Sequence, residues 1–110
     1  DWSRIAALYE VLHGVWPSPV IELNRAVAVG MSAGYAEGLA IVDALAAAGA
    51  LRDYPHLPAV RADFLARLGR HEEAAAAYAT AAELTRNDQE RALFVRRADE
   101  QRAMTASRHS

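Results

Sequence analysis

Hydrophobic residues recur at every third or fourth position along most of the chain, which is the spacing of one face of an α-helix. In the first such segment, residues 2–13, Ile5, Leu8, Tyr9 and Leu12 share one helical face. No segment shows the apolar and polar alternation of a half-buried strand. The pattern therefore predicts an all-α protein with about six helices.

Turn-forming and capping residues set the expected limits of the first three helices. Gly14 and the prolines at 17 and 19 are expected to stop the first helix at about residue 13. Ser18 is expected to cap a second helix with Pro19 in its first turn, ending at Gly30. Ser32 is expected to cap a third helix, which Gly49 closes.

Three further helices are expected after the irregular connection at residues 52–55. They cover about residues 57–68, 71–84 and 88–104. Gly69 and Arg70 form the short turn between the first two of these helices. Asn87 and Glu90 have the spacing of a capping box at the start of the last one. The tail from Thr105 is expected to fray.

The sequence repeats itself at a constant offset of 36 residues, since residues 24–45 align with residues 60–81 without a gap. Ala26 aligns with Ala62, and Gly38 aligns with Ala74. Small residues at these positions allow two helices joined by a short turn to pack closely. A repeat of this length is typical of stacked helical hairpins that share one core. These small positions resemble those of tetratricopeptide repeats, and the resemblance implies a helical hairpin solenoid.

Composition excludes several classes of protein. The chain has 110 residues, no cysteine and a net charge of −2. We therefore expect one domain over residues 1–110, cytoplasmic and without disulfides or thiolate metal sites. Clustered positive charge for binding DNA is not evident, and neither is a membrane span or a signal peptide. Because the chain does not begin with Met, we expect it to be a piece of a longer protein.

A narrower resemblance rests on several strings taken together. They are Pro17-Ser18-Pro19-Val20, Leu23 to Val29, Gly38-Leu39, Arg61 to Leu65 and Arg67 to Arg70. With them the chain resembles the C-terminal tetratricopeptide-like extension of extracytoplasmic-function RNA polymerase sigma factors of bacteria. The resemblance implies a regulatory or assembly module for transcription initiation, whose partner is RNA polymerase or the sigma factor's own N-terminal regions. A free-standing tetratricopeptide adaptor is the alternative.

Two arginines, Arg25 and Arg61, occupy equivalent positions in the repeat where tetratricopeptide repeats usually carry leucine. Each has a guanidinium able to bind a carboxylate of a partner. The structural alternative pairs each arginine with an acid nearby, for example Glu22 with Arg25. Asn24 and Arg67 are the other polar candidates on the expected groove. The rest of that groove is apolar or acidic, which favours a peptide held by apolar contact over a carboxylate clamp.

Aromatic and aliphatic residues of the first helix form a second candidate surface. Trp2, Ile5, Tyr9 and Trp16 belong to half of a hairpin whose other helix is not in the chain, so they are expected to promote self-association.

Catalytic residues, metal ligands and cofactor motifs are not expected. The four histidines, His13, His56, His71 and His109, lack a second ligand at metal-binding spacing. The adjacent carboxylates of Glu72 and Glu73 diverge on a helix, whereas an acid and base pair must face one cleft. The sequence therefore predicts a binding module and not an enzyme.

Overall fold

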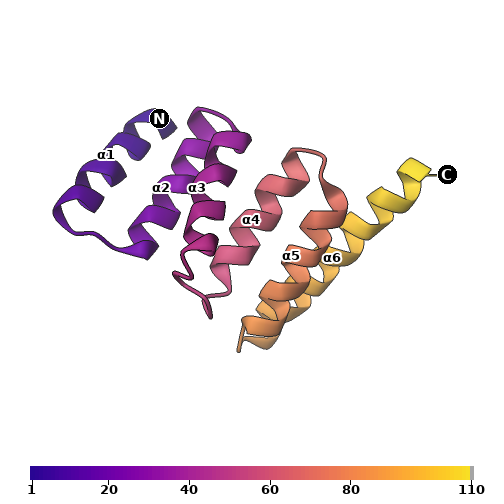
Figure 1. Ribbon diagram of the computed structural model, residues 1–110. Helices are drawn as coiled ribbons and strands as arrows, with labels where there is room; N and C mark the ends of the chain where they lie inside the picture. Colours follow the sequence, from indigo (N-terminus) through magenta and orange to yellow (C-terminus); the bar gives the residue numbers. More distant parts are fainter. Residues whose placement is uncertain (110) are drawn as a thin grey trace. The chain divides into compact units, whose positions relative to one another are not determined.

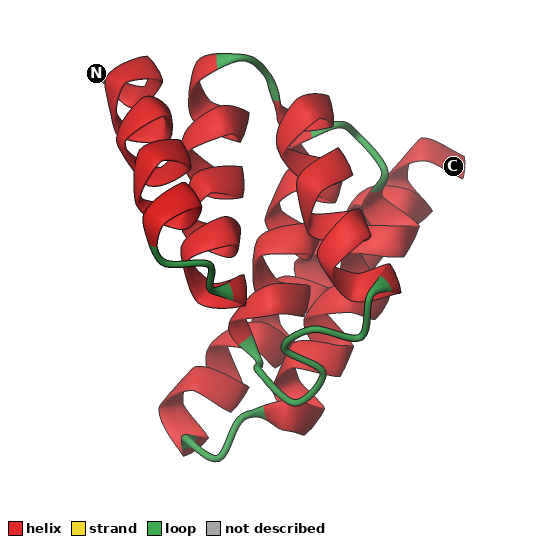
Figure 2. Ribbon diagram, turned by 60° about the vertical axis from the view of Figure 1, so that its left-hand side comes forward, coloured by secondary structure: helices red, strands yellow, loops and turns green. Residues whose placement is uncertain are grey.

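Six α-helices make up the fold in the computed structural model, which describes residues 1–109 (Figure 1). The helices are α1 (Trp2–Val15), α2 (Pro19–Ser32), α3 (Tyr35–Ala47), α4 (His56–Arg67), α5 (His71–Leu84) and α6 (Asp88–His109). Figure 2 shows short loops between them and no strand among the described residues. The all-α class and the expected six helices are confirmed.

Two compact units divide the chain, one from Asp1 to Arg52 and one from Asp53 to Ser110. In the first unit, α2 packs against both α1 and α3. In the second unit, α5 packs against both α4 and α6. Each unit is thus a set of three successive helices in which the middle helix contacts both neighbours.

The 36-residue offset of the sequence reappears in the helix limits and in the burial pattern. Helix α3 begins at Tyr35 and α5 begins at His71, which is the same offset. Ala26 and Ala62 are both fully buried, and Gly38 and Ala74 are buried as well. Because these side chains are small, each pair of helices joined by a turn packs closely. The repeat therefore corresponds to two equivalent helical hairpins, α2–α3 and α4–α5.

The two units differ in the size of their buried side chains. The core of the first unit contains Leu23, Leu39 and Val42 with small residues between them, and α1 contributes no buried residue. Larger side chains fill the second core, which includes Phe64, Leu65, Tyr78 and Phe94. Burial of apolar area is the main stabilising term in folding. The second unit therefore has the stronger core.

Several expected helix limits near glycine and serine are wrong. Gly14 lies inside α1, which continues to Val15, and Gly30 lies buried inside α2, which continues to Ser32. The break after α2 comes at Gly34, whose φ of +134° is open to glycine and rare for other residues. Ser32 does not cap α3, because its hydroxyl donates to the Val29 carbonyl at 3.4 Å and Gly34 occupies the N-cap position.

The start of α6 confirms half of the expected capping box. Asn87 Oδ1 accepts a hydrogen bond from the Glu90 backbone N–H at 2.9 Å. The Glu90 carboxylate instead accepts from the Thr85 hydroxyl at 2.6 Å. Helix α6 continues beyond the expected end at about residue 104, to His109.

Candidate partner-binding site

A charged pair on α2 marks the candidate site in the first unit. Arg25 Nε lies 2.5 Å from Glu22 Oε1, and Arg25 Nη2 donates to Glu22 Oε2 at 3.2 Å. The side chains are 24% and 22% exposed for Arg25 and Glu22, respectively. A residue spacing of three places both groups on one face of the helix. Arg25 therefore holds its own acid through two parallel bonds, as the structural alternative predicted.

The charges around this pair favour its ionised form. Hydrogen bonding to Arg25 lowers the pKa of Glu22, although partial burial opposes that shift. Hydrogen bonding to Glu22 raises the pKa of Arg25, and the charge of Glu10 adds to the effect. The charge of His13 also lowers the pKa of Glu22. Side chains of α1 thus act electrostatically on the pair.

A groove of about 370 Å³ lies beside the pair, between α2 and α3. Its apolar wall consists of residues of α3 and the C-cap residue Ala48, while Glu22 and Arg25 form its polar edge. The wall residues are Ala40, Ile41, Ala44, Leu45 and Ala48. Because the alanines recur every fourth position, they form a smooth strip along the helix. Such a surface suits apolar side chains of a protein partner, with the ion pair available to polar groups at the edge.

The equivalent position in the second unit is paired differently. Arg61 aligns with Arg25, but Pro58 stands where the first unit has Glu22, so no acid lies three residues before it. Arg61 instead lies close enough to Glu73 to contribute to the lowered pKa of that carboxyl, whose main cause is its hydrogen bonding to Arg70. Arg70 binds the Glu73 carboxylate with both Nε and Nη2, at 2.9 and 2.8 Å.

The four predicted partner-binding residues are distributed over both units. Asn24 and Arg25 are neighbours on α2, but Asn24 is exposed and does not line the groove. Arg61 and Arg67 lie on α4, where Arg67 Nε donates to Asp63 Oδ2 at 3.1 Å. Of the four residues, Arg25 lines the groove between α2 and α3.

The four residues predicted to mediate self-association also separate into two sets. Ile5 and Tyr9 are half-buried, on the face of α1 directed towards α2. Trp2 and Trp16 remain 43% and 73% exposed. The largest exposure on α1 falls on other apolar residues, namely Leu8, Val11 and Val15.

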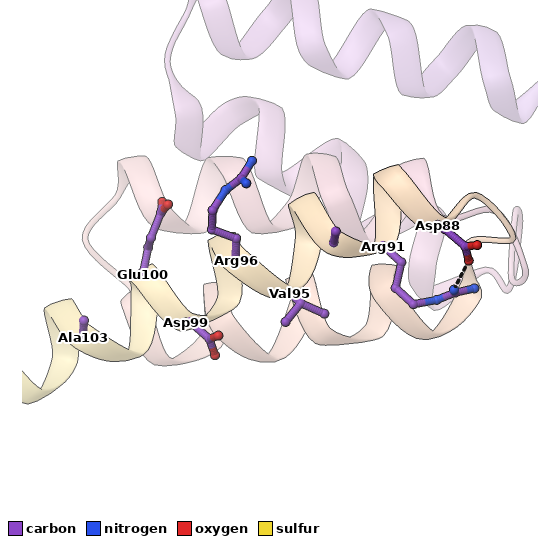
Figure 3. A pocket seen from close by; sticks show the side chains of 8 residues that line it. Asp88, Arg91, Val95, Arg96, Asp99, Glu100 and Ala103 are labelled. Atoms are coloured by element: carbon purple, nitrogen blue, oxygen red, sulfur yellow. Dashed lines mark hydrogen bonds and ion pairs between the residues drawn. The ribbon is translucent and has the colours of Figure 1, made fainter.

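A second groove lies on α6. Figure 3 shows its lining side chains along one strip of the helix, with Val95 between charged residues. Arg91 extends towards Asp88 and donates to its Oδ1 at 2.7 Å. The same guanidinium donates to the backbone carbonyl of Thr85 at 2.7 Å and to that of Ala82 at 3.3 Å. Arg91 therefore holds the end of α5 against α6.

Polar side chains also connect the helices of the second unit. His71 Nδ1 lies 2.7 Å from Gln101 Oε1, which links the start of α5 to α6. Tyr78 is buried in the core, and this burial raises the pKa of its hydroxyl; the charge of Asp63 acts in the same direction. Arg97 opposes the shift by hydrogen bonding to Tyr78.

No group of three or more His, Cys, Asp or Glu side chains in the described part of the chain is arranged to hold a metal ion. The side chain of His109 lies outside that part. None of the helices in the described residues has the length and apolar character needed to cross a bilayer.

Most of this chain is similar to a segment of a longer bacterial protein. An uncharacterized protein of Rhizobium meliloti (strain 1021) is 39% identical to this chain over 94 residues. The match covers 86% of this chain and 22% of the relative, so the chain spans about a fifth of the relative's length. No protein-family model matches the chain, and no solved structure matches it significantly.

Proposed function

We propose that the chain is a non-catalytic protein-interaction module with a regulatory role in a cytoplasmic bacterial RNA polymerase sigma factor. The groove between α2 and α3 carries this proposal, because it combines an exposed apolar wall with a fixed ion pair at its edge. The equivalent hairpins α2–α3 and α4–α5 support a tetratricopeptide-like solenoid, in which such grooves bind partner segments. The sigma-factor assignment rests on the sequence strings described above.

The relative from Rhizobium meliloti supports a module within a longer protein. Its segment matching this chain makes up 22% of its length, so most of that protein lies outside the shared region. The partner that we propose, RNA polymerase or the sigma factor's own N-terminal regions, rests on the sequence resemblance.

A binding experiment with two matched variants tests the proposal. Ala40 lines the groove, and Ala76 is the residue 36 positions later, exposed on α5. The 110-residue chain is immobilised, and its affinity for purified core RNA polymerase and for the sigma factor's N-terminal regions is measured. Ala40→Glu should weaken binding by about tenfold or more, since it buries an unpaired carboxylate against the partner, whereas Ala76→Glu should not.

The outcomes of this experiment distinguish a sigma-factor module from a free-standing tetratricopeptide adaptor. Binding to neither component would contradict the sigma-factor proposal. Binding that both variants weaken equally would contradict the groove as the site. Transcription from a cognate promoter, compared between the full-length protein and a form lacking these 110 residues, provides the functional readout. An unchanged transcript yield would exclude a regulatory role.

A further inference from the structure

One face of α1 is apolar and exposed from Leu8 to Val15. Leu8, Val11 and Val15 are 64%, 67% and 80% exposed, and Leu12 is 42% exposed beside them. Their spacing of three and four residues places them on one side of the helix, which borders the half-buried Ile5 and Tyr9. Trp16, which directly follows α1, is 73% exposed. We call these five residues, Leu8, Val11, Leu12, Val15 and Trp16, the α1 face.

The α1 face has the size of one half of a small dimer interface. Its side chains expose roughly 50–200 Å² each and on the order of 600 Å² together, while a stable interface buries about 600–1,000 Å² per partner. Exposed apolar patches on monomers are rarely larger than this. Covering the face with an equivalent surface removes the apolar area of both copies from water.

The arrangement of residues on the face suits a two-fold axis. Leu8 and Val15 are equally distant from the midpoint between Val11 and Leu12. An antiparallel copy therefore places Leu8 opposite Val15 of the other copy, and Val11 opposite Leu12 of the other copy. Arg4 lies on the same side at the N-terminal end, one turn before Leu8. A parallel pair would bring the two Arg4 side chains together, whereas an antiparallel pair separates them and opposes the helix dipoles.

We infer that two copies of this chain associate through their α1 faces, packed antiparallel about an axis near Val11 and Leu12. The partner is thus a second copy of the chain. This dimer does not depend on the proposed role in transcription, because it uses α1 and leaves the groove between α2 and α3 accessible to another protein.

Mass measurement tests the association directly. In sedimentation equilibrium, the apparent mass of the chain should rise towards twice that of the monomer at concentrations of ~10–100 μM, the weak end of affinities for interfaces of this size. Val11→Glu places two carboxylates at the axis and should weaken dimerisation by about 100-fold. Val95→Glu is the matched control, since Val95 is 47% exposed on α6, and its dimerisation should match the wild type.

Cross-linking tests the geometry, and it is unambiguous because the chain has no cysteine of its own. Val11→Cys should form a covalent dimer under mild oxidation, since the two copies meet at the axis. Ser3→Cys, exposed on another side of α1, should remain reduced under the same conditions. A concentration-independent monomer mass would overturn the proposal. Cross-linking of Leu8→Cys as efficient as that of Val11→Cys would overturn the antiparallel arrangement, because a parallel pair brings both residues close to their own copies.

Discussion

At the scale of single residues, Arg25 serves two roles that the sequence could not separate. Its guanidinium binds both oxygens of Glu22 and lies at the edge of the groove beside α3. The spacing of three residues was enough to predict the ion pair. The apolar wall was missed because alanine occurs on buried and exposed helix faces alike, and only packing shows that Ala40, Ala44 and Ala48 are exposed.

The ion pair should make stability depend on pH. Since the folded-state pKa of Glu22 is lowered, its ionised form stabilises the fold above the unfolded-state value of about 4.5, and this contribution is lost as the pH falls through the folded-state pKa. Glu22→Gln should therefore reduce the free energy of unfolding by about 1 kcal/mol at neutral pH and by much less near pH 3. Urea denaturation at both pH values measures the difference.

Glu83 provides the control for that measurement, because it is an exposed acid on α5 in the other unit. Glu83→Gln should leave the free energy of unfolding within about 0.5 kcal/mol of the wild type. A loss for Glu22→Gln that is equally large at acidic pH would show that packing of the side chain, and not its charge, is responsible.

At the scale of helices, the sequence predicted the existence and the order of the six helices well, but it predicted several of the helix ends poorly. Gly14 and Gly30 were both expected to end helices, yet both lie inside them. Glycine weakens a helix by only about 1 kcal/mol, which neighbouring turns and packing offset. Where a glycine has positive φ, as Gly34, Gly49 and Gly69 do, the helix does end. Backbone conformation therefore decides helix ends, and residue type alone does not reveal it.

Two glycine substitutions should have opposite effects for this reason. A Cβ at Gly14 meets nothing within 4 Å and Gly14 is helical, so Gly14→Ala should stabilise the fold by about 0.5 kcal/mol. Gly69 has equal room but a φ of +79°, so Gly69→Ala should destabilise it by about 1 kcal/mol. Thermal unfolding of both variants measures the shifts. A lower melting temperature for Gly14→Ala would contradict the assignment of Gly14 to α1.

Arg91 should be the residue that most strongly connects the end of α5 to α6. Its guanidinium donates to two backbone carbonyls and to Asp88. Arg91→Ala should destabilise the chain by about 1–2 kcal/mol. Arg91→Lys should recover only part of this stability, because an ammonium group cannot reproduce the planar, forked arrangement of N–H donors of the guanidinium. Arg96→Ala, an exposed arginine on the same helix, is the control. Equal stability of Arg91→Lys and the wild type would show that charge alone suffices.

At the scale of the whole molecule, the repeat was the most reliable signal in the sequence. The offset of 36 residues predicted the equivalence of the α2–α3 and α4–α5 hairpins, because the same small residues must be buried in each. It did not predict that the two hairpins belong to separate compact units. Nor did it predict which side of α1 is exposed, since Ile5, Leu8, Tyr9 and Leu12 all fit one helical stripe.

The unequal cores predict unequal protection from hydrogen exchange. Helix α1 has no buried residue, whereas α5 contains six, including Tyr78. Local opening costs least where few apolar side chains are buried, so amides of α1 should exchange fastest and those of α5 slowest in dilute protein. If two copies pair through the α1 face, raising the protein concentration should slow exchange in α1 while leaving α5 unchanged. Val11→Glu should abolish that concentration dependence, and its persistence in the variant would show that another surface holds the copies together.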